Sequence, residues 1–118
     1  MKLYPTLRYE DPRAAHDWLH RALGFESVAV HEDGGIVQHA EMRWGEDLIM
    51  FGAPSEKFPI SPATIYVTCE DPDAAYARAK EAGGDITMEL VDQAYGSREF
   101  SVRDPEGHTW SFGTYEPR

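Results

Sequence analysis

Cysteine is almost absent from the 118-residue chain, in which Cys69 stands alone. A single cysteine excludes an internal disulfide and a zinc-ribbon spacing, and with them the classes of small protein that depend on either. Cys69 falls at the end of an expected strand, where it reads as a small apolar side chain and not as a nucleophile.

Long apolar runs are also lacking. No stretch approaches the ~20 apolar residues that a membrane-spanning helix requires. The opening residues Met1–Pro5 show no apolar region of the signal-peptide kind. We therefore expect a cytoplasmic protein.

Basic residues are scarce: 11 lysines and arginines stand against 21 acidic residues, for a net charge of −10. A negative field disfavours nucleic acids and anionic membranes, because both are polyanions. Neither is expected as a partner. The acidity is compatible with a cationic ligand, and equally with a role in solubility alone.

What the chain does contain is an internal repeat. Glu10-Asp11-Pro12 returns as Glu70-Asp71-Pro72, and Phe51-Gly52 returns as Phe112-Gly113 at nearly the same offset. Between the copies lies a proline-rich stretch without apolar periodicity, residues 53–62. We predict one domain, residues 1–118, of two modules: about 1–53 and about 63–118, joined by a linker at about 54–62.

Each module is predicted to run strand, helix, strand, strand, strand. Asp11 and Asp71 stand where helix N-caps belong, each followed by proline at the first helical position. Gly24 is suited to end the first helix in the left-handed conformation. The expected strands are Leu3–Tyr9, Ser27–His31, Val37–Trp44, Leu48–Gly52, Thr64–Cys69, Asp85–Glu89, Arg98–Arg103 and His108–Thr114.

Three segments of the second module resemble a known superfamily. They are Tyr95–Phe100 (YGSREF), Asp104–His108 (DPEGH) and Trp110–Gly113 (WSFG). With paired βαβββ modules, they resemble the vicinal oxygen chelate superfamily of glyoxalase I, bleomycin-resistance proteins and extradiol dioxygenases. The resemblance implies an α+β fold of two paired βαβββ modules, with curved mixed sheets around a cleft, and a homodimer.

Metal-using members of this superfamily place their ligands near the start of the first strand and on the last strand of each module. Aligned on the helix starts and the Phe-Gly pairs, these positions are Tyr4, Met50, Thr64 and Ser111. A thioether and neutral hydroxyls are poor ligands for Zn²⁺, Ni²⁺ or Fe²⁺. We expect no metal and no cofactor, which argues against glyoxalase I or extradiol dioxygenase activity.

Strand alternation predicts which side chains face the cleft. The rings of Tyr66, Tyr95 and Phe100 either stack on a flat ligand or serve packing alone. The expected ligand-binding residues are Tyr4, Arg8, His39, Glu41, Met50, Tyr66, Tyr95, Phe100 and Ser111. Arg8 either anchors a carboxylate or phosphate or pairs with Glu41. His39 beside Glu41 has three interpretations: proton transfer, ligand contact, or structural polarity alone. His108 follows a turn and is expected to be structural.

The resemblance and the missing ligands favour a metal-independent small-molecule binding protein of the bleomycin-resistance kind. It would sequester an antibiotic or metabolite of cationic or aromatic character in the inter-module cleft. The alternative is a glyoxalase-like lyase or isomerase, or a dioxygenase-type enzyme, that uses His39 and Glu41 or a non-standard metal site. Whether the protein is an enzyme stays open, and a protein-binding regulator is a third hypothesis.

Overall fold

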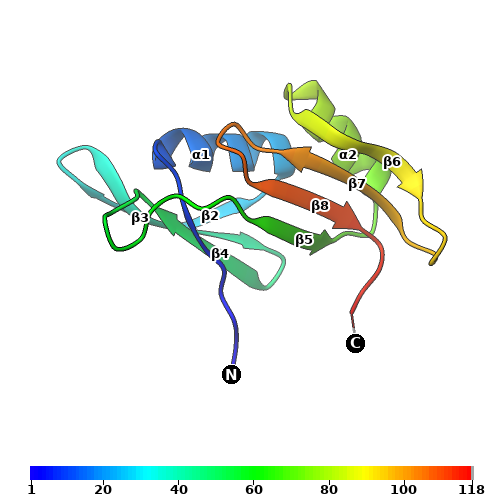
Figure 1. Ribbon diagram of the computed structural model, residues 1–118, viewed down its shortest axis with the longest axis horizontal. Helices are drawn as coiled ribbons and strands as arrows, with labels where there is room; N and C mark the ends of the chain where they lie inside the picture. The colour runs from blue at the N-terminus through cyan, green and yellow to red at the C-terminus, as the bar shows by residue number, and fades with distance from the viewer. Residues whose placement is uncertain (118) are drawn as a thin grey trace. The chain divides into compact units, whose positions relative to one another are not determined.

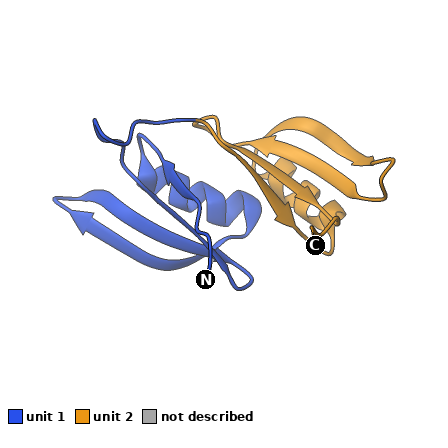
Figure 2. Ribbon diagram, turned by 60° about the horizontal axis from the view of Figure 1, so that its bottom comes forward, with its two compact units in different colours: residues 1–61 blue, residues 62–118 orange. Residues whose placement is uncertain are grey.

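The same order of elements occurs twice along the chain (Figure 1). The computed structural model describes residues 1–117, and the chain divides into a first unit of residues 1–61 and a second unit of residues 62–118 (Figure 2). Each unit has one four-stranded mixed sheet with a helix lying across one face. The predicted βαβββ pattern is thereby confirmed in both halves.

The first unit has the strand order β1-β4-β3-β2, in which β1 is parallel to β4 and the other pairs are antiparallel. Its elements are β1 (Thr6–Arg8), α1 (Pro12–Trp18), the π-helical turn η1 (Leu19–Leu23), β2 (Glu26–Asp33), β3 (Ile36–Trp44) and β4 (Asp47–Gly52). The expected first strand, Leu3–Tyr9, is too long: the register with β4 covers Thr6–Arg8, and backbone hydrogen bonds to β4 extend only to Pro5 and Tyr9. Strand alternation over Leu3–Tyr9 would place Leu3 on the core side with Leu7, but Leu3 is 96% exposed.

The second unit repeats this topology with the order β5-β8-β7-β6, and β5 is parallel to β8. Its elements are β5 (Thr64–Thr68), α2 (Pro72–Glu81), β6 (Asp85–Asp92), β7 (Arg98–Arg103) and β8 (Thr109–Gly113). A parallel pair needs a crossover connection, and each unit supplies one through its helix and hairpin. The repeat in the sequence is thus a repeat of topology.

The helix starts are built as the sequence predicts. The Asp11 and Asp71 carboxylates accept hydrogen bonds from the backbone N–H groups of Ala14 and Ala74, each at 3.0 Å. These bonds satisfy donors that have no partner within the helix. The first helix ends at Gly24, whose φ of 87° is the left-handed conformation that glycine adopts without steric cost.

Each core lies between the helix and one face of its sheet. In the first unit five apolar helix side chains that recur at helical spacing in the sequence are all buried: Ala15, Trp18, Leu19, Ala22 and Leu23. In the second unit the buried apolar side chains of the sheet are Val67, Phe100, Val102, Trp110 and Phe112. The face of each sheet turned away from its helix is called the outer face below.

The turn before β8 is held by Asp104. Its buried carboxylate accepts from the backbone N–H groups of Glu106 and His108 and from the Trp110 indole N–H at 3.1 Å. The His108 ring is fully buried, and its Nδ1 accepts from the Ala63 N–H at 3.0 Å. The expectation that His108 is structural is confirmed.

Within residues 1–117 no helix is both long and apolar enough to cross a membrane.

Candidate functional site

The outer face of the second sheet carries a group of polar and aromatic side chains. Phe100 and Val102 of β7 point into the core, so Glu99 and Ser101, which alternate with them, lie on the outer face. Ser111 of β8 stands opposite Ser101 in register, and their hydroxyl oxygens are 2.7 Å apart. Tyr66 of β5 stands opposite Ser111. The β7–β8–β5 register therefore brings these residues together.

Glu99 is the most informative residue of this face, because it is only 8% exposed. Its Oε1 accepts from the Tyr95 hydroxyl at 2.6 Å and from the Gln93 amide at 3.5 Å. The other oxygen, Oε2, has no hydrogen-bond donor among the described residues. Since no described side-chain oxygen is both fully buried and unpartnered, Oε2 keeps access to solvent.

Glu99 has no cationic partner within residues 1–117. The adjacent Arg98 is engaged by two other carboxylates, Asp73 at 2.7 Å and Asp92 at 3.1 Å. A carboxylate nine-tenths buried ordinarily needs such a partner, since removing a charge from water costs several kcal/mol. Within residues 1–117 no positive side chain offsets the cost of burying this carboxylate.

Tyr95, which donates to this carboxylate, is linked through Tyr115 to a third tyrosine, Tyr66. Tyr66 donates to the Tyr115 carbonyl at 2.6 Å, and the two rings have centroids 6.5 Å apart. Tyr95 packs edge-on against Tyr115 with centroids 6.2 Å apart. We call Glu99, Tyr66, Tyr95 and Tyr115 the tyrosine–glutamate cluster.

The cluster shifts the acidity of its phenols. The hydrogen bond to Glu99, with desolvation second, raises the pKa of Tyr95 to about 12. Burial raises the pKa of Tyr66, and the nearby charge of Glu99 adds to the rise. Both phenols therefore stay protonated at neutral pH and act as hydrogen-bond donors, not as bases.

The first unit has its own polar group on the outer face of its sheet. His39 Nε2 and Glu41 Oε2 of β3 are 2.8 Å apart, and both side chains are partly exposed. His31 of β2 lies opposite His39, with ring centroids 5.9 Å apart. Met50 of β4 lies opposite Glu41 in register. The predicted His39–Glu41 pair therefore exists as a hydrogen-bonded pair.

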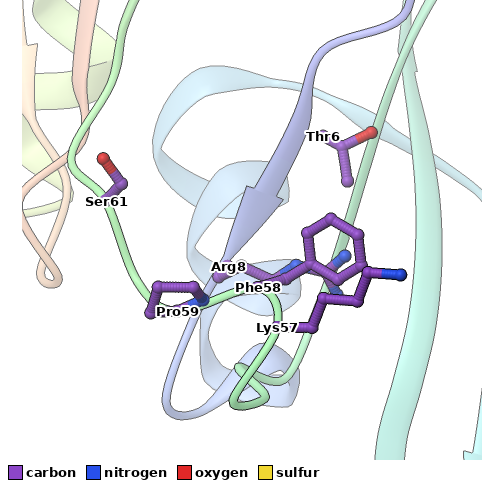
Figure 3. A pocket seen from close by; sticks show the side chains of 6 residues that line it. All are labelled: Thr6, Arg8, Lys57, Phe58, Pro59 and Ser61. Atoms are coloured by element: carbon purple, nitrogen blue, oxygen red, sulfur yellow. The ribbon is translucent and has the colours of Figure 1, made fainter.

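Arg8 lies beside a pocket of about 520 Å³ in the first unit. The pocket is lined by Thr6, Arg8, Lys57, Phe58, Pro59 and Ser61 (Figure 3). Arg8 donates to the Ala53 carbonyl at 3.3 Å and lies over the Phe58 ring, 5.0 Å from its centroid. A pairing of Arg8 with Glu41 stays a prediction.

The structure sorts the expected ligand-binding residues into separate groups. Tyr66, Tyr95 and Ser111 lie on the outer face of the second sheet, while Arg8, His39, Glu41 and Met50 lie on that of the first. Tyr4 is exposed and precedes β1.

The expectation for Phe100 is wrong. Its ring is 0% exposed, stacks on Phe112 and meets Tyr76 of α2 edge-on. A ligand on the outer face cannot reach a ring that points into the core. Strand alternation itself contains the correction, because Phe100 is two positions from the core residue Val102.

Two important residues are missing from the sequence prediction. Glu99 alternates with Phe100 and could have been found from that alternation, once Phe100 was assigned to the core. Phe58 lies between β4 and β5, in a segment without periodicity, so no sequence signal marks it.

The residues at the superfamily's metal positions do not fit a catalytic divalent metal. Met50 offers a thioether, and Thr64 and Ser111 offer neutral hydroxyls, which are poor ligands for such ions. The Ser111 hydroxyl is hydrogen-bonded to Ser101. Residues 1–117 hold no cluster of three or more histidine, cysteine, aspartate or glutamate side chains suited to a metal ion. We derive no chemical step through a metal.

The chain is similar to known proteins over almost its whole length. Two uncharacterized proteins, from Mycobacterium bovis and Mycobacterium tuberculosis, are each 32% identical over 126 residues; the alignments cover 94% of this chain and 81% and 72% of theirs. TioX from Micromonospora sp. ML1 has 31% identity and a TM-score of 0.88, with 98% of this chain and 99% of TioX covered.

More distant structures share the fold alone. A lactoylglutathione lyase from Agrobacterium tumefaciens superposes with a TM-score of 0.74 at 17% identity, over 96% of this chain and 92% of the lyase. A family model matches residues 3–112, nearly the whole chain. The chain belongs to the Glyoxalase/Bleomycin resistance protein/Dioxygenase superfamily.

Proposed function

We propose that this protein is a metal-independent binding protein for an organic cation of aromatic character, an antibiotic or a metabolite. The observation that carries the proposal is Glu99, a carboxylate only 8% exposed that has no cationic partner within residues 1–117. The ligand's positive charge lies at Glu99 Oε2. Its apolar part contacts the rings of Tyr66, Tyr95 and Tyr115.

The physical argument has two parts. A cation beside Glu99 offsets the desolvation of the carboxylate, because the attraction is strong where water is scarce. Tyrosine rings carry negative charge on their faces and attract cations within about 6 Å, more strongly when the cation is desolvated. The net charge of −10 raises the local concentration of cations around the whole protein.

The test uses proflavine, a flat fluorescent cation, and benzyltrimethylammonium, with neutral benzyl alcohol for comparison. We expect both cations to bind saturably and the alcohol to bind far more weakly. Glu99→Gln keeps the shape of the side chain and removes its charge. It should weaken cation binding about tenfold or more, the loss expected for one charge-assisted contact.

Two controls make this test specific. Glu41→Gln removes a charge from the outer face of the first unit and should leave the dissociation constant unchanged. Treatment with EDTA should also leave it unchanged. Cation affinity that survives Glu99→Gln, or that disappears with the chelator, would overturn the proposal.

A second candidate function is supported by the His39–Glu41 hydrogen bond of 2.8 Å. A carboxylate that orients an imidazole is an arrangement used for proton transfer in lyases and isomerases. The hemithioacetal of methylglyoxal and glutathione is the first substrate to assay. Turnover that is lost in both His39→Ala and Glu41→Gln would support the enzyme, and absence of turnover with this substrate would count against a glyoxalase.

A further inference from the structure

The pocket beside Arg8 has the opposite electrostatic character to the tyrosine–glutamate cluster. Two cationic side chains, Arg8 and Lys57, line it, and none of its six lining residues is acidic. This is notable in a chain with 21 acidic and 11 basic residues. Figure 3 shows both side chains beside the Phe58 ring.

Both cationic side chains lie close to the ring of Phe58. The Arg8 guanidinium lies 5.0 Å and the Lys57 Nζ lies 5.9 Å from the centroid of the same ring. Contact with an aromatic face holds a guanidinium in one orientation and leaves its edge to donate hydrogen bonds. Arg8 Nη1 also donates a hydrogen bond to the Ala53 carbonyl at 3.3 Å.

Strand β4 passes Arg8 at a glycine. Gly52 lies opposite Arg8 in the β1–β4 register. A Cβ at Gly52 would lie 3.4 Å from Arg8 Nη1 and 2.2 Å from the Gln38 carbonyl oxygen. The Gln38 carbonyl therefore requires a glycine at this position of β4, and Arg8 lies just beyond it at ordinary contact distance.

We propose that this pocket binds a small aromatic carboxylate. The carboxylate of the ligand accepts hydrogen bonds from Arg8, because a guanidinium matches the two oxygens of a carboxylate. It also forms an ion pair with Lys57. The ring of the ligand contacts Phe58 and Pro59, and the hydroxyls of Thr6 and Ser61 are available to polar substituents. This site is independent of the proposed cation site in charge, in residues and in unit.

The experiment uses benzoate as the probe and inorganic phosphate as an anion without a ring. Binding is followed by calorimetry and by ¹H–¹⁵N NMR of the Thr6–Arg8 and Lys57–Phe58 amides. We expect benzoate to shift these amides saturably. Arg8→Gln should weaken benzoate binding about tenfold, and Lys57→Gln should weaken it by a smaller factor.

The remaining variants separate the parts of the proposal. Phe58→Leu should weaken benzoate more than phosphate, because only benzoate has a ring to contact. Lys2→Gln, a matched loss of an exposed positive charge outside the pocket, should change neither affinity. If Arg8→Gln fails to fold, Lys57→Gln carries the test, since Lys57 is exposed.

Three results would overturn the inference. One is the absence of amide shifts at saturating benzoate, and another is unchanged affinity in Lys57→Gln and Arg8→Gln. The third is phosphate binding as tight as benzoate and indifferent to Phe58→Leu, which would show a general anion site in place of an arene carboxylate site. Proflavine binding should persist in Arg8→Gln, so failure here is distinguishable from failure of the proposed function.

Discussion

Among single residues, Tyr95 has a raised pKa that predicts how the stability of the protein depends on pH. Its pKa of about 12 in the folded protein exceeds the ordinary value of 10.0, because its hydroxyl donates to Glu99. The folded state holds this proton more tightly than the unfolded state, so the contribution to stability is complete below pH 10. This contribution to stability is lost as the pH rises from about 10 to about 12.

An ultraviolet titration of tyrosinate absorbance tests this prediction. Wild-type protein should show a phenol that ionises near pH 12 and that is missing in Tyr95→Phe. In Glu99→Gln the same phenol should ionise nearer pH 10, since the carboxylate acceptor is gone. Tyr4→Phe, in an exposed residue before β1, serves as the control. An identical high-pH titration in wild type and Tyr95→Phe would contradict the assignment.

Gly113 leaves no space for a side chain, which gives a second prediction for a single residue. A Cβ there would lie 2.6 Å from both Glu99 Cγ and the Tyr66 hydroxyl oxygen. Gly113→Ala should therefore displace these side chains, destabilise the protein by about 1–3 kcal/mol and abolish proflavine binding. Urea unfolding and fluorescence titration measure the two effects. Gly52→Ala is the comparison: it should destabilise the first unit through the Gln38 carbonyl, and any folded fraction should keep its affinity for proflavine.

At the scale of elements, the two helix starts are equivalent in construction. Asp11 and Asp71 each accept from the N–H group three residues later, at 3.0 Å. Asp11→Ala and Asp71→Ala should each lower the free energy of unfolding by about 1 kcal/mol in urea denaturation. Glu46→Ala, an acidic residue in the turn before β4, should have almost no effect. A loss in one variant only would show that the two caps do not contribute alike.

The π-helical turn Leu19–Leu23 shows what local patterns leave out. Helical periodicity correctly predicts that Leu19, Ala22 and Leu23 are buried. It does not predict that the helix widens after Trp18, because a burial pattern on one face fits either turn.

For the whole molecule, the net charge of −10 predicts a salt dependence. Charges are screened over about 10 Å at 0.1 M salt and about 3 Å at 1 M. Proflavine affinity should therefore fall several-fold between these concentrations, while benzyl alcohol should show no comparable fall. Fluorescence titration in sodium chloride provides the measurement. Salt-independent proflavine binding would mean that charge does not hold the ligand.

The homodimer that the family resemblance implies also stays a prediction at this scale. Light scattering should give twice the mass of one chain in dilute solution. A mass of one chain at all concentrations would contradict it.

The sequence by itself determined the repeated βαβββ order, the caps at Asp11 and Asp71, and the alternation that divides core from outer face. These follow from local rules: backbone donors need acceptors at helix starts, and strand side chains alternate. The tertiary structure alone decided the surroundings of Glu99 and Arg8. Those depend on which strands lie side by side, since register brings Tyr66 to Ser111 and Gly113 to Glu99, and contacts between residues distant along the chain have no local signature.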